Sequence, residues 1–376
     1  MTVKQQHILL DATVVNSKPT GVGRSVLEIL SNLSQIETPM RFTVAVSNQT
    51  QFDFLEDKRN WDVVQIKQCG SGFLHRLFAT HLEIPKLAKK LDVDLVHFMT
   101  MPASLHLNCL SILTVHDIAF HLFPDTVDFM RRVYYRLTLG LSIRNASAII
   151  TTSETTAAEL SGLHTEAKDR IAVTTFGLPQ WADTNSAESV RNNSAPLLFV
   201  GSLEPRKNLD RILDAYLLFR KSNPESELPI LTIAGGRGWL DKKLVKRIEF
   251  LEGEKLVTWL GYCSQDKLLE LYNSSSALLF PSLHEGFGFP ILEAMASNLP
   301  VITSNRGAMK EVAGGAALLV DPESTDSIAQ AIEQLYFDRV LAERISKLGA
   351  LRCKEMNWLK TASETLEIYK RILTLQ

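Results

Sequence analysis

Residues 280–295 read FPSLHEGFGFPILEAM, which joins the end of an apolar strand to a glycine-containing loop and the start of a helix. Phe280 ends the strand, and Pro290 stands where a first helical turn tolerates the missing N–H of proline. Gly286 and Gly288 let the backbone approach a ligand closely. With the free N–H groups of the helix start, they predict an anion site suited to a diphosphate.

The same order of short apolar run and longer amphipathic stretch recurs through most of the chain. Runs this short and this apolar are typical of parallel strands that are buried on both faces. We predict strands at 8–10, 42–45, 63–66, 95–98, 111–115 and 148–151, and then at 197–200, 230–233, 257–260, 277–280, 301–303 and 317–320. The pattern predicts a doubly wound α/β fold that occurs twice.

A polar, turn-forming segment at about 177–196 separates the two halves and has the composition of a surface linker. The length of 376 residues fits two domains. We therefore expect two Rossmann-like domains, at 1–180 and 196–356, and a closing helix at 357–376 that packs back on the first domain. Open sheets bind ligands beyond the carboxyl ends of their strands, so we expect the site in the crevice between the domains.

The composition excludes several classes of protein. Forty basic and 42 acidic residues give a net charge of -2, so no overall field favours nucleic acid as a partner. The apolar run 7–10 is too short for a signal-peptide core, and no apolar stretch reaches transmembrane length. The four cysteines form no C-x-x-C pair, which favours reduced thiols. We expect a cytoplasmic protein, with attachment to the inner face of the membrane left open.

Two glutamates, Glu285 and Glu293, flank the glycine loop eight positions apart. Carboxylates beside a diphosphate are electrostatically unfavourable unless they have another task. They can accept hydrogen bonds from sugar hydroxyls or face a developing oxocarbenium charge. The alternative is a helix start that simply carries glutamate.

Arg206 and Lys207 follow a strand and a glycine, on a loop that starts a helix. Two cations in this place can neutralise the oxygens of a leaving diphosphate. The alternative is a solvated pair at a helix terminus.

The N-terminal half holds two weaker candidates. Gly21-Val22-Gly23-Arg24 follows the first strand and opens a helix that we expect to begin near Ser25, so its N–H groups could face the same diphosphate. His116 ends a strand whose carboxyl end should open on the crevice, although a lone histidine is usually structural. Asp117 either orients His116 or caps the next turn.

Taken together, these strings resemble retaining glycosyltransferases of family 4, which adopt the GT-B fold. Residues 280–295 resemble the E-x7-E region of that family. The other matching segments, in chain order, are 20–24, 114–117, 200–208, 234–239 and 260–262. Many family members carry an arginine after the glycine of the phosphate loop, where this chain has Ser202.

The resemblance implies a metal-independent transferase with a nucleotide-sugar donor and no other cofactor. Glu285 and His116 would attend the transferred sugar, Glu293 the ribose, and Arg206 with Lys207 the diphosphate. The further positions implied in donor binding are Gly21, Gly23, Gly235, Gly261, Tyr262, Gly286, Phe287, Gly288 and Phe289.

Within the family, the chain looks most like mannosyltransferases of bacterial surface-glycan assembly, which implies GDP-mannose as donor and a glycan or lipid-linked acceptor. Three alternatives remain: a sucrose- or trehalose-type synthase that uses a UDP- or ADP-sugar, a sugar-nucleotide epimerase, and a non-catalytic nucleotide-sugar-binding protein. The E-x7-E setting disfavours the epimerase. The filled motif set, Ser202 excepted, disfavours the binder.

Two other strings carry simpler interpretations. Asp92-Val93-Asp94 spells the D-x-D of metal-dependent transferases, but it precedes a buried strand at its amino end, where we expect a turn. No other cluster suggests a metal. Residues 130–136, continuing to Arg144, form a basic amphipathic helix that could touch anionic lipid or an acidic acceptor, or present a solvated face.

Overall fold

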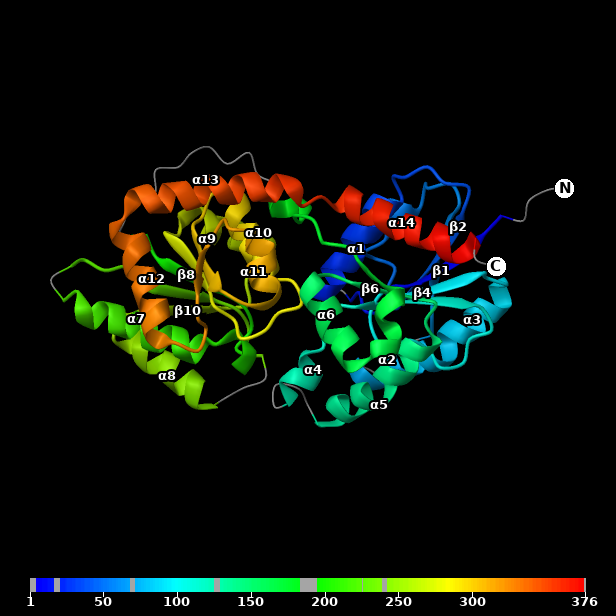
Figure 1. Cartoon of the computed structure of the whole chain (residues 1–376), viewed down its shortest axis with the longest axis horizontal. Helices are drawn as coiled ribbons and strands as arrows, with labels where there is room; N and C mark the ends of the chain where they lie inside the picture. Colours follow the sequence, from blue (N-terminus) through cyan, green and yellow to red (C-terminus); the bar gives the residue numbers. More distant parts are fainter. Residues whose placement is uncertain are drawn as a thin grey trace. The chain divides into compact units, whose positions relative to one another are not determined.

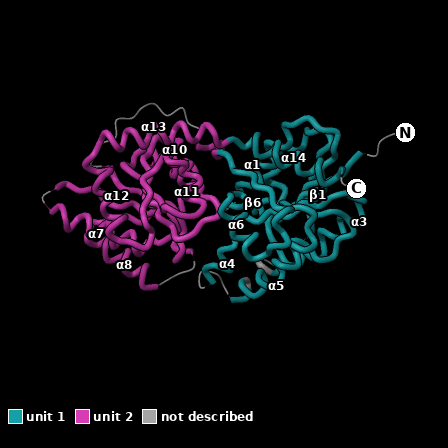
Figure 2. Tube along the Cα trace, in the orientation of Figure 1, with its two compact units in different colours: residues 1–177, 357–376 teal, residues 178–356 magenta. Residues whose placement is uncertain are grey.

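The computed structural model describes residues 5–16, 21–67, 72–124, 129–182, 195–224, 226–238 and 242–374. The chain divides into two compact units, which are Met1–Gly177 with Asn357–Gln376, and Leu178–Met356 (Figures 1 and 2). Each unit holds one parallel sheet with helices on both faces (Figure 1). The predicted doubly wound α/β fold is confirmed in both. Most of the predicted linker, at 183–194, lies outside the described residues.

Unit 1 contains a seven-stranded sheet in the order β3-β2-β1-β4-β5-β6-β7. Its strands are β1 (His7–Asp11), β2 (Arg41–Val46), β3 (Trp61–Gln65), β4 (Leu95–Phe98), β5 (Leu110–Val115), β6 (Ala148–Thr151) and β7 (Ile171–Val173). The six strands predicted for this half are confirmed. The prediction missed β7, because this edge strand consists of three half-buried residues and is not part of a longer apolar run.

The helices of unit 1 cover the two faces of this sheet. They are α1 (Gly21–Leu33), α2 (Gly72–Phe78), the π-helical η2 (Ala79–Glu83), α3 (Ile84–Leu91), α4 (Ala119–Leu122), α5 (Phe129–Asn145), α6 (Glu154–Leu163) and α14 (Trp358–Thr374). The predicted start of the first helix near Ser25 was wrong. Gly23 is buried on the same side of α1 as Val26 and Leu30, so the buried stripe extends into the preceding turn and the helix begins at Gly21.

Helix α14 completes the core of unit 1. It lies against α1, and its buried Tyr369 hydroxyl meets His97 Nδ1 of β4 at 2.6 Å. His97 Nε2 meets the Thr114 hydroxyl of β5 at 2.8 Å. Burial, with a smaller effect of His116, lowers the pKa of His97 to about 3, so its ring is neutral near pH 7 and joins three elements by hydrogen bonds.

Unit 2 contains a six-stranded sheet in the order β10-β9-β8-β11-β12-β13. Its strands are β8 (Leu197–Val200), β9 (Leu231–Ala234), β10 (Val257–Gly261), β11 (Ala277–Phe280), β12 (Val301–Ser304) and β13 (Leu318–Val320). Its helices are α7 (Leu209–Ser222), α8 (Lys242–Gly253), α9 (Gln265–Ser274), α10 (Phe289–Ala296), α11 (Gly307–Ala313), α12 (Thr325–Phe337) and α13 (Arg339–Glu355). All six strands predicted for this half are confirmed.

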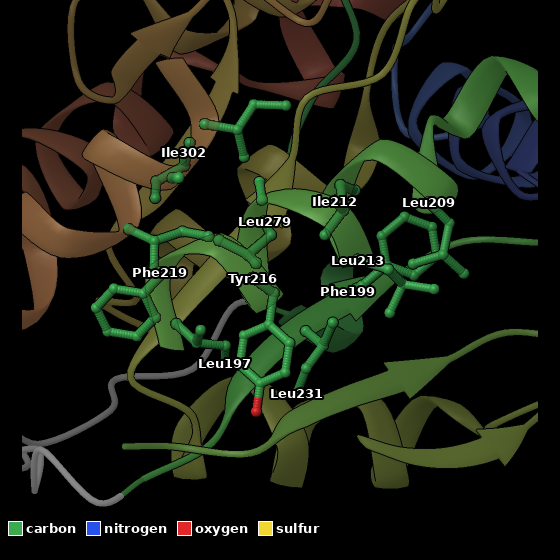
Figure 3. Packing of buried hydrophobic residues seen from close by; sticks show 14 of the residues in the cluster. Leu197, Phe199, Leu209, Ile212, Leu213, Tyr216, Phe219, Leu231, Leu279 and Ile302 are labelled. Atoms are coloured by element: carbon green, nitrogen blue, oxygen red, sulfur yellow. The ribbon is translucent and has the colours of Figure 1, made fainter. Parts of the chain in front are cut away.

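The core of unit 2 forms between its sheet and the helices α7, α8 and α12 (Figure 3). Tyr216 of α7 lies at its centre and is fully buried, which removes a large apolar ring from water. Its hydroxyl donates to the carbonyl oxygens of Pro229 and Leu256, both at 2.9 Å. The buried polar group is thereby satisfied, and it fixes the helix against the turns that lead into β9 and β10.

The strand order creates a switch point in each sheet. In unit 2 the chain runs outward from β8 through β9 to β10, and outward on the other side from β11 through β12 to β13. The loops after β8 and β11 therefore emerge side by side at the carboxyl edge, where open α/β sheets bind their ligands. In unit 1 the corresponding neighbours are β1 and β4.

The D-x-D string forms the predicted turn before β4. Asp92 ends α3 with a left-handed backbone, φ +49°, and the Asp94 carboxylate accepts from the His7 N–H at 2.8 Å.

Cys263 and Cys353 are buried free thiols, and Cys109 is half-buried. Across the described ranges, no helix combines the length and the apolar character needed to cross a membrane.

Candidate active site

The loops after β8 and β11 bring two cations onto one carboxylate. Arg206 and Lys207 belong to the short turn η6 (Pro205–Lys207), and Glu285 lies five residues beyond β11. Lys207 Nζ donates to Glu285 Oε1 at 2.6 Å, and Arg206 Nη1 donates to Glu285 Oε2 at 2.6 Å. Lys207 and Glu285 are buried. Lys207 and Arg206 are 78 and 79 positions from Glu285 in the sequence, yet the three predicted site residues form one cluster.

The charges of this cluster depend on one another. Burial alone would raise the pKa of Glu285, but the charges and hydrogen bonds of Arg206 and Lys207 outweigh it and hold that pKa at about 2. Burial lowers the pKa of Lys207, and the Glu285 carboxylate opposes that change. Lys207 Nζ also lies 5.2 Å from the ring centroid of Phe280. Glu285 is therefore an anion at every physiological pH.

Glu204 orients Arg206, a role that the sequence analysis missed. One oxygen of its carboxylate accepts from Arg206 Nε at 3.0 Å, and the other accepts from the Ser202 hydroxyl at 2.7 Å. Ser202 stands where the family resemblance implied an arginine, and its hydroxyl donates to the carboxylate that holds Arg206. The spacing of two residues between Glu204 and Arg206 was the only signal for this pair in the sequence.

Asn208, also missed, joins the loops on which the cluster stands. Its backbone is left-handed, φ +63°, which asparagine tolerates better than most residues. Its side-chain amide donates to the carbonyl oxygens of Pro281 at 2.9 Å and Pro322 at 2.7 Å. Because Pro281 follows β11 and Pro322 follows β13, one side chain ties three strand ends together.

The glycine loop leads directly into α10. Gly288 precedes the helix with φ +108°, which a residue with a side chain rarely adopts, and Pro290 lies in the first turn as predicted. The ring centroids of Phe287 and Phe289 are 5.2 Å apart, and Phe287 is buried. The loop with Gly286 thus ends at a helix start where Pro290 has no N–H and the Ile291 N–H donates to the Gly288 carbonyl oxygen at 3.0 Å, so the N–H groups expected to be free there are not all available to an anion.

Glu293 lies inside α10 and is buried. Its Oε2 accepts from the hydroxyl of Tyr272 at 2.6 Å. Tyr272 belongs to α9 and is fully buried, so it fixes the orientation of the carboxylate. No sequence pattern indicates this partner, because a tyrosine 21 positions away on another helix has no recognisable spacing.

Gly235 directly follows β9, and Gly261 is the last residue of β10. The Gly235 N–H donates to the Gly261 carbonyl at 2.7 Å. A Cβ atom on Gly235 would stand 1.8 Å from the carbonyl oxygen of Gly201, so only glycine lets these loops approach so closely. The side chain of Tyr262 is 66% exposed and is thus available to a ligand.

The remaining predicted residues, Gly21, Gly23 and His116, belong to unit 1. Gly21 and Gly23 lie in the first turn of α1. His116 follows β5 and is half-buried, and its Nε2 meets the Met99 carbonyl oxygen at 2.9 Å. Burial lowers the pKa of His116, against the opposing effects of that hydrogen bond and of Asp117, so the ring is neutral near pH 7.

Of the two roles considered for Asp117, the structure shows the capping of the next turn. Its Oδ1 accepts from the Ala119 N–H at 3.0 Å, which caps the turn that opens α4. Within the described ranges, no three His, Cys, Asp or Glu side chains gather in a way that could hold a metal ion.

Comparison with known families agrees with this geometry. The sequence model of Glycosyltransferase Family 4 matches residues 19–177, and that of Glycosyl transferases group 1 matches residues 183–352. The chain belongs to glycosyltransferase family 4 and is a glycosyltransferase with the GT-B fold.

Its relatives include two bacterial O-antigen chain mannosyltransferases. The O-antigen chain mannosyltransferase B of Escherichia coli is 31% identical over 268 residues, which cover 69% of this chain and 70% of that protein. The O-antigen chain mannosyltransferase RfbU of Salmonella typhimurium is 30% identical over 225 residues, which cover 59% of this chain and 60% of that protein.

Solved structures share the fold at lower identity. The sucrose-phosphate synthase of Thermosynechococcus elongatus has a TM-score of 0.75 at 18% identity, covering 99% of this chain and all of that one. The Anabaena protein HepE, in complex with UDP and glucose, has a TM-score of 0.72 at 19% identity, covering 98% of this chain and all of that one.

Proposed function

We propose that this glycosyltransferase moves mannose from GDP-mannose to a glycan or lipid-linked acceptor, with retention of the anomeric configuration and without a metal ion. The mannosyltransferases among its relatives support the choice of sugar. The observation that carries the mechanism is the contact of Arg206 and Lys207 with the single carboxylate of Glu285.

Arg206 and Lys207 would stabilise the leaving nucleoside diphosphate. Both cations already hold an anion at 2.6 Å, so their charged groups converge on one point beside the switch point of the sheet. Diphosphate oxygens that reach this point would take over part of these contacts. Two fixed cations then neutralise the charge that develops as the glycosidic bond breaks, the task that a divalent ion performs in other transferases.

Glu293 would bind the ribose. Its carboxylate is buried and oriented by the Tyr272 hydroxyl. Ribose hydroxyl groups are donors, and a buried carboxylate is a strong acceptor for them. Loss of such a partner leaves a buried hydroxyl unsatisfied, which weakens nucleotide binding rather than the chemical step.

Glu285 and His116 would contact the transferred sugar, which is the role that their positions in the family motifs imply. Because its pKa is held at about 2, Glu285 keeps a full negative charge that favours the positive charge developing at the anomeric carbon. His116 is neutral near pH 7, and a neutral imidazole can exchange hydrogen bonds with a sugar hydroxyl.

A thermal-shift panel with GDP, UDP and ADP tests the donor. A nucleotide that binds only the folded protein raises its melting temperature. We expect GDP to give the largest shift. A larger shift with UDP or ADP would overturn GDP-mannose in favour of the other donors, and binding without any sugar-nucleotide hydrolysis would favour a non-catalytic binder.

A further inference from the structure

The imidazole ring of His116 packs on two buried aromatic side chains that the proposed function does not use. Its ring centroid lies 5.8 Å from that of Phe176, which in turn lies 5.0 Å from the ring centroid of Trp358. Phe176 and Trp358 are 3% and 4% exposed. Phe176 lies three positions beyond β7, and Trp358 is the first residue of α14. We call Phe176 and Trp358 the aromatic row, which belongs to unit 1 as His116 does.

The backbone around the aromatic row is closely packed. A Cβ atom on Gly177 would stand 2.4 Å from the backbone nitrogen of Trp358, so only glycine fits there. The Thr361 hydroxyl, in the first turn of α14, donates to the Thr175 carbonyl oxygen at 2.5 Å. Because Thr175 and Gly177 flank Phe176 in the sequence, these contacts fix the segment that carries Phe176 against the start of α14.

One hydrogen bond to a neighbouring loop holds the His116 ring itself. Its Nε2 lies 2.9 Å from the Met99 carbonyl oxygen, and because a carbonyl oxygen only accepts, the proton of the neutral ring is on Nε2. Nδ1 is then the acceptor of the ring. The Asp117 carboxylate is engaged in capping the next turn. Rotation of a histidine ring about its Cβ–Cγ bond has no sharp minimum, so the packed ring of Phe176 has to set its tilt.

We propose that Trp358, acting through Phe176, is a positioning residue that holds the His116 ring with Nδ1 toward the donor sugar. The inference rests on the proposed contact of His116 with that sugar. Nδ1 can accept from a sugar hydroxyl only while the ring keeps this orientation, and a displacement of about 1 Å can lower a rate by about 100-fold. A purely structural role of the aromatic row would lower stability and leave the turnover of the folded enzyme unchanged.

The first test compares turnover with nucleotide binding. Trp358→Leu and Phe176→Leu each remove an aromatic ring and keep an apolar side chain. With saturating GDP-mannose and no acceptor, both variants should release GDP roughly 10–100 times more slowly than the parent. Their GDP dissociation constants, from calorimetric titration, should stay close to that of the parent, because GDP carries no sugar. Trp358→Phe restores a ring and should recover most of the turnover.

Trp61→Leu is the matched control, because it makes the same substitution in the same unit. Trp61 begins β3 and stacks on Phe42 with ring centroids 4.4 Å apart, and it is not part of the aromatic row. This variant should lose stability but hydrolyse GDP-mannose as the parent does. All rates are measured well below the Tm of the least stable variant, so that each enzyme is folded.

The second test observes the His116 ring by NMR without any ligand. With isotope-labelled histidine nitrogens, the signals of His116 are assigned by their loss in His116→Gln. The parent should show the two widely separated nitrogen shifts of one neutral tautomer, protonated at Nε2. In Trp358→Leu and Phe176→Leu the two shifts should move toward each other, because the ring then exchanges between orientations that protonate different nitrogens.

Three results would overturn the proposal: parental turnover in both Trp358→Leu and Phe176→Leu, an equal loss of turnover in Trp61→Leu, or a loss of turnover without a change in the His116 signals. The proposed function would fail in other ways. Absence of turnover in the parent would overturn GDP-mannose as the donor, and parental turnover in His116→Ala would overturn the contact with the sugar. In either case the His116 signals still decide whether Trp358 holds the ring.

Discussion

Replacing Glu285 by glutamine removes the anion that holds Arg206 and Lys207 and leaves the shape of the side chain nearly unchanged. The pKa of Glu285 falls from an ordinary value of 4.5 to about 2 in the folded protein. At about 1.4 kcal/mol for each tenfold change in the acid dissociation constant, the folded state gains about 3 kcal/mol from the ionised group. Glu285→Gln should therefore lower the stability of the protein by up to about that amount.

Differential scanning calorimetry measures the loss. For a unit the size of residues 178–356, about 3 kcal/mol corresponds to a fall in Tm of roughly 6–12 °C. Glu270→Gln is the matched control, because Glu270 pairs with Lys267 on the surface at 64% side-chain exposure. An exposed pair of this kind contributes at most about 1 kcal/mol.

The informative quantity is the further shift that GDP produces. In the parent protein the diphosphate must compete with Glu285 for Arg206 and Lys207, whereas in Glu285→Gln the only one of these carboxylates that remains is Glu204, which holds Arg206 Nε and leaves Lys207 unpaired by it. We expect GDP to raise the Tm of Glu285→Gln by more than it raises that of the parent. An equal or smaller rise in the variant would refute the idea that the carboxylate and the diphosphate share these cations.

The sign of the pH effect follows from the same pKa. A depressed carboxyl pKa contributes stability that is complete above about 4.5 and is lost as the pH falls toward about 2. The difference in Tm between the parent and Glu285→Gln should therefore be constant at neutral pH and shrink below about pH 4.5. A difference that persists unchanged in acid would mean that packing, and not charge, explains the variant.

Three further outcomes are expected. Glu293→Ala should weaken GDP binding by about 1–3 kcal/mol, measured by calorimetric titration, whereas Glu285→Ala should mainly lower turnover. If each variant changed the GDP dissociation constant and the turnover number equally and only slightly, this assignment of roles would be wrong. Gly235→Ala should destabilise the protein by about 3 kcal/mol or more in urea, because its Cβ would stand 1.8 Å from the Gly201 oxygen, whereas Gly236→Ala, which meets nothing within 4 Å, should be mild. Activity should survive EDTA, since the cationic pair serves the diphosphate; loss of turnover that magnesium or manganese restores would contradict this.

The strands could be predicted because most of them are buried on both faces and so appear as unbroken apolar runs, such as 197–200 and 277–280. β7 could not, since an edge strand of three half-buried residues leaves no such run. The start of α1 was misplaced because glycine usually marks a loop, whereas Gly23 is buried within the helical stripe. Burial against the rest of the fold overrode local preference there.

The site residues could be named individually, but most of their contacts could not. Arg206 and Glu285 meet because β8 and β11 are neighbours at the switch point. The order of strands within a sheet cannot be predicted from local sequence. Tyr272 and Glu293 meet across two helices for the same kind of reason. The partners of charged groups, and hence the pKa of Glu285, became visible only once the sheet was assembled.

Hydrolysis of GDP-mannose without an acceptor, followed by proton NMR, tests the central claim most directly. The donor carries an α-linked mannose, and a retaining transferase that passes the sugar to water releases the α-anomer first, before it equilibrates in solution. We predict the early appearance of α-mannose together with GDP, at a rate that falls in Glu285→Ala. Initial release of the β-anomer would contradict retention, and release no faster than in protein-free buffer would contradict GDP-mannose as the donor.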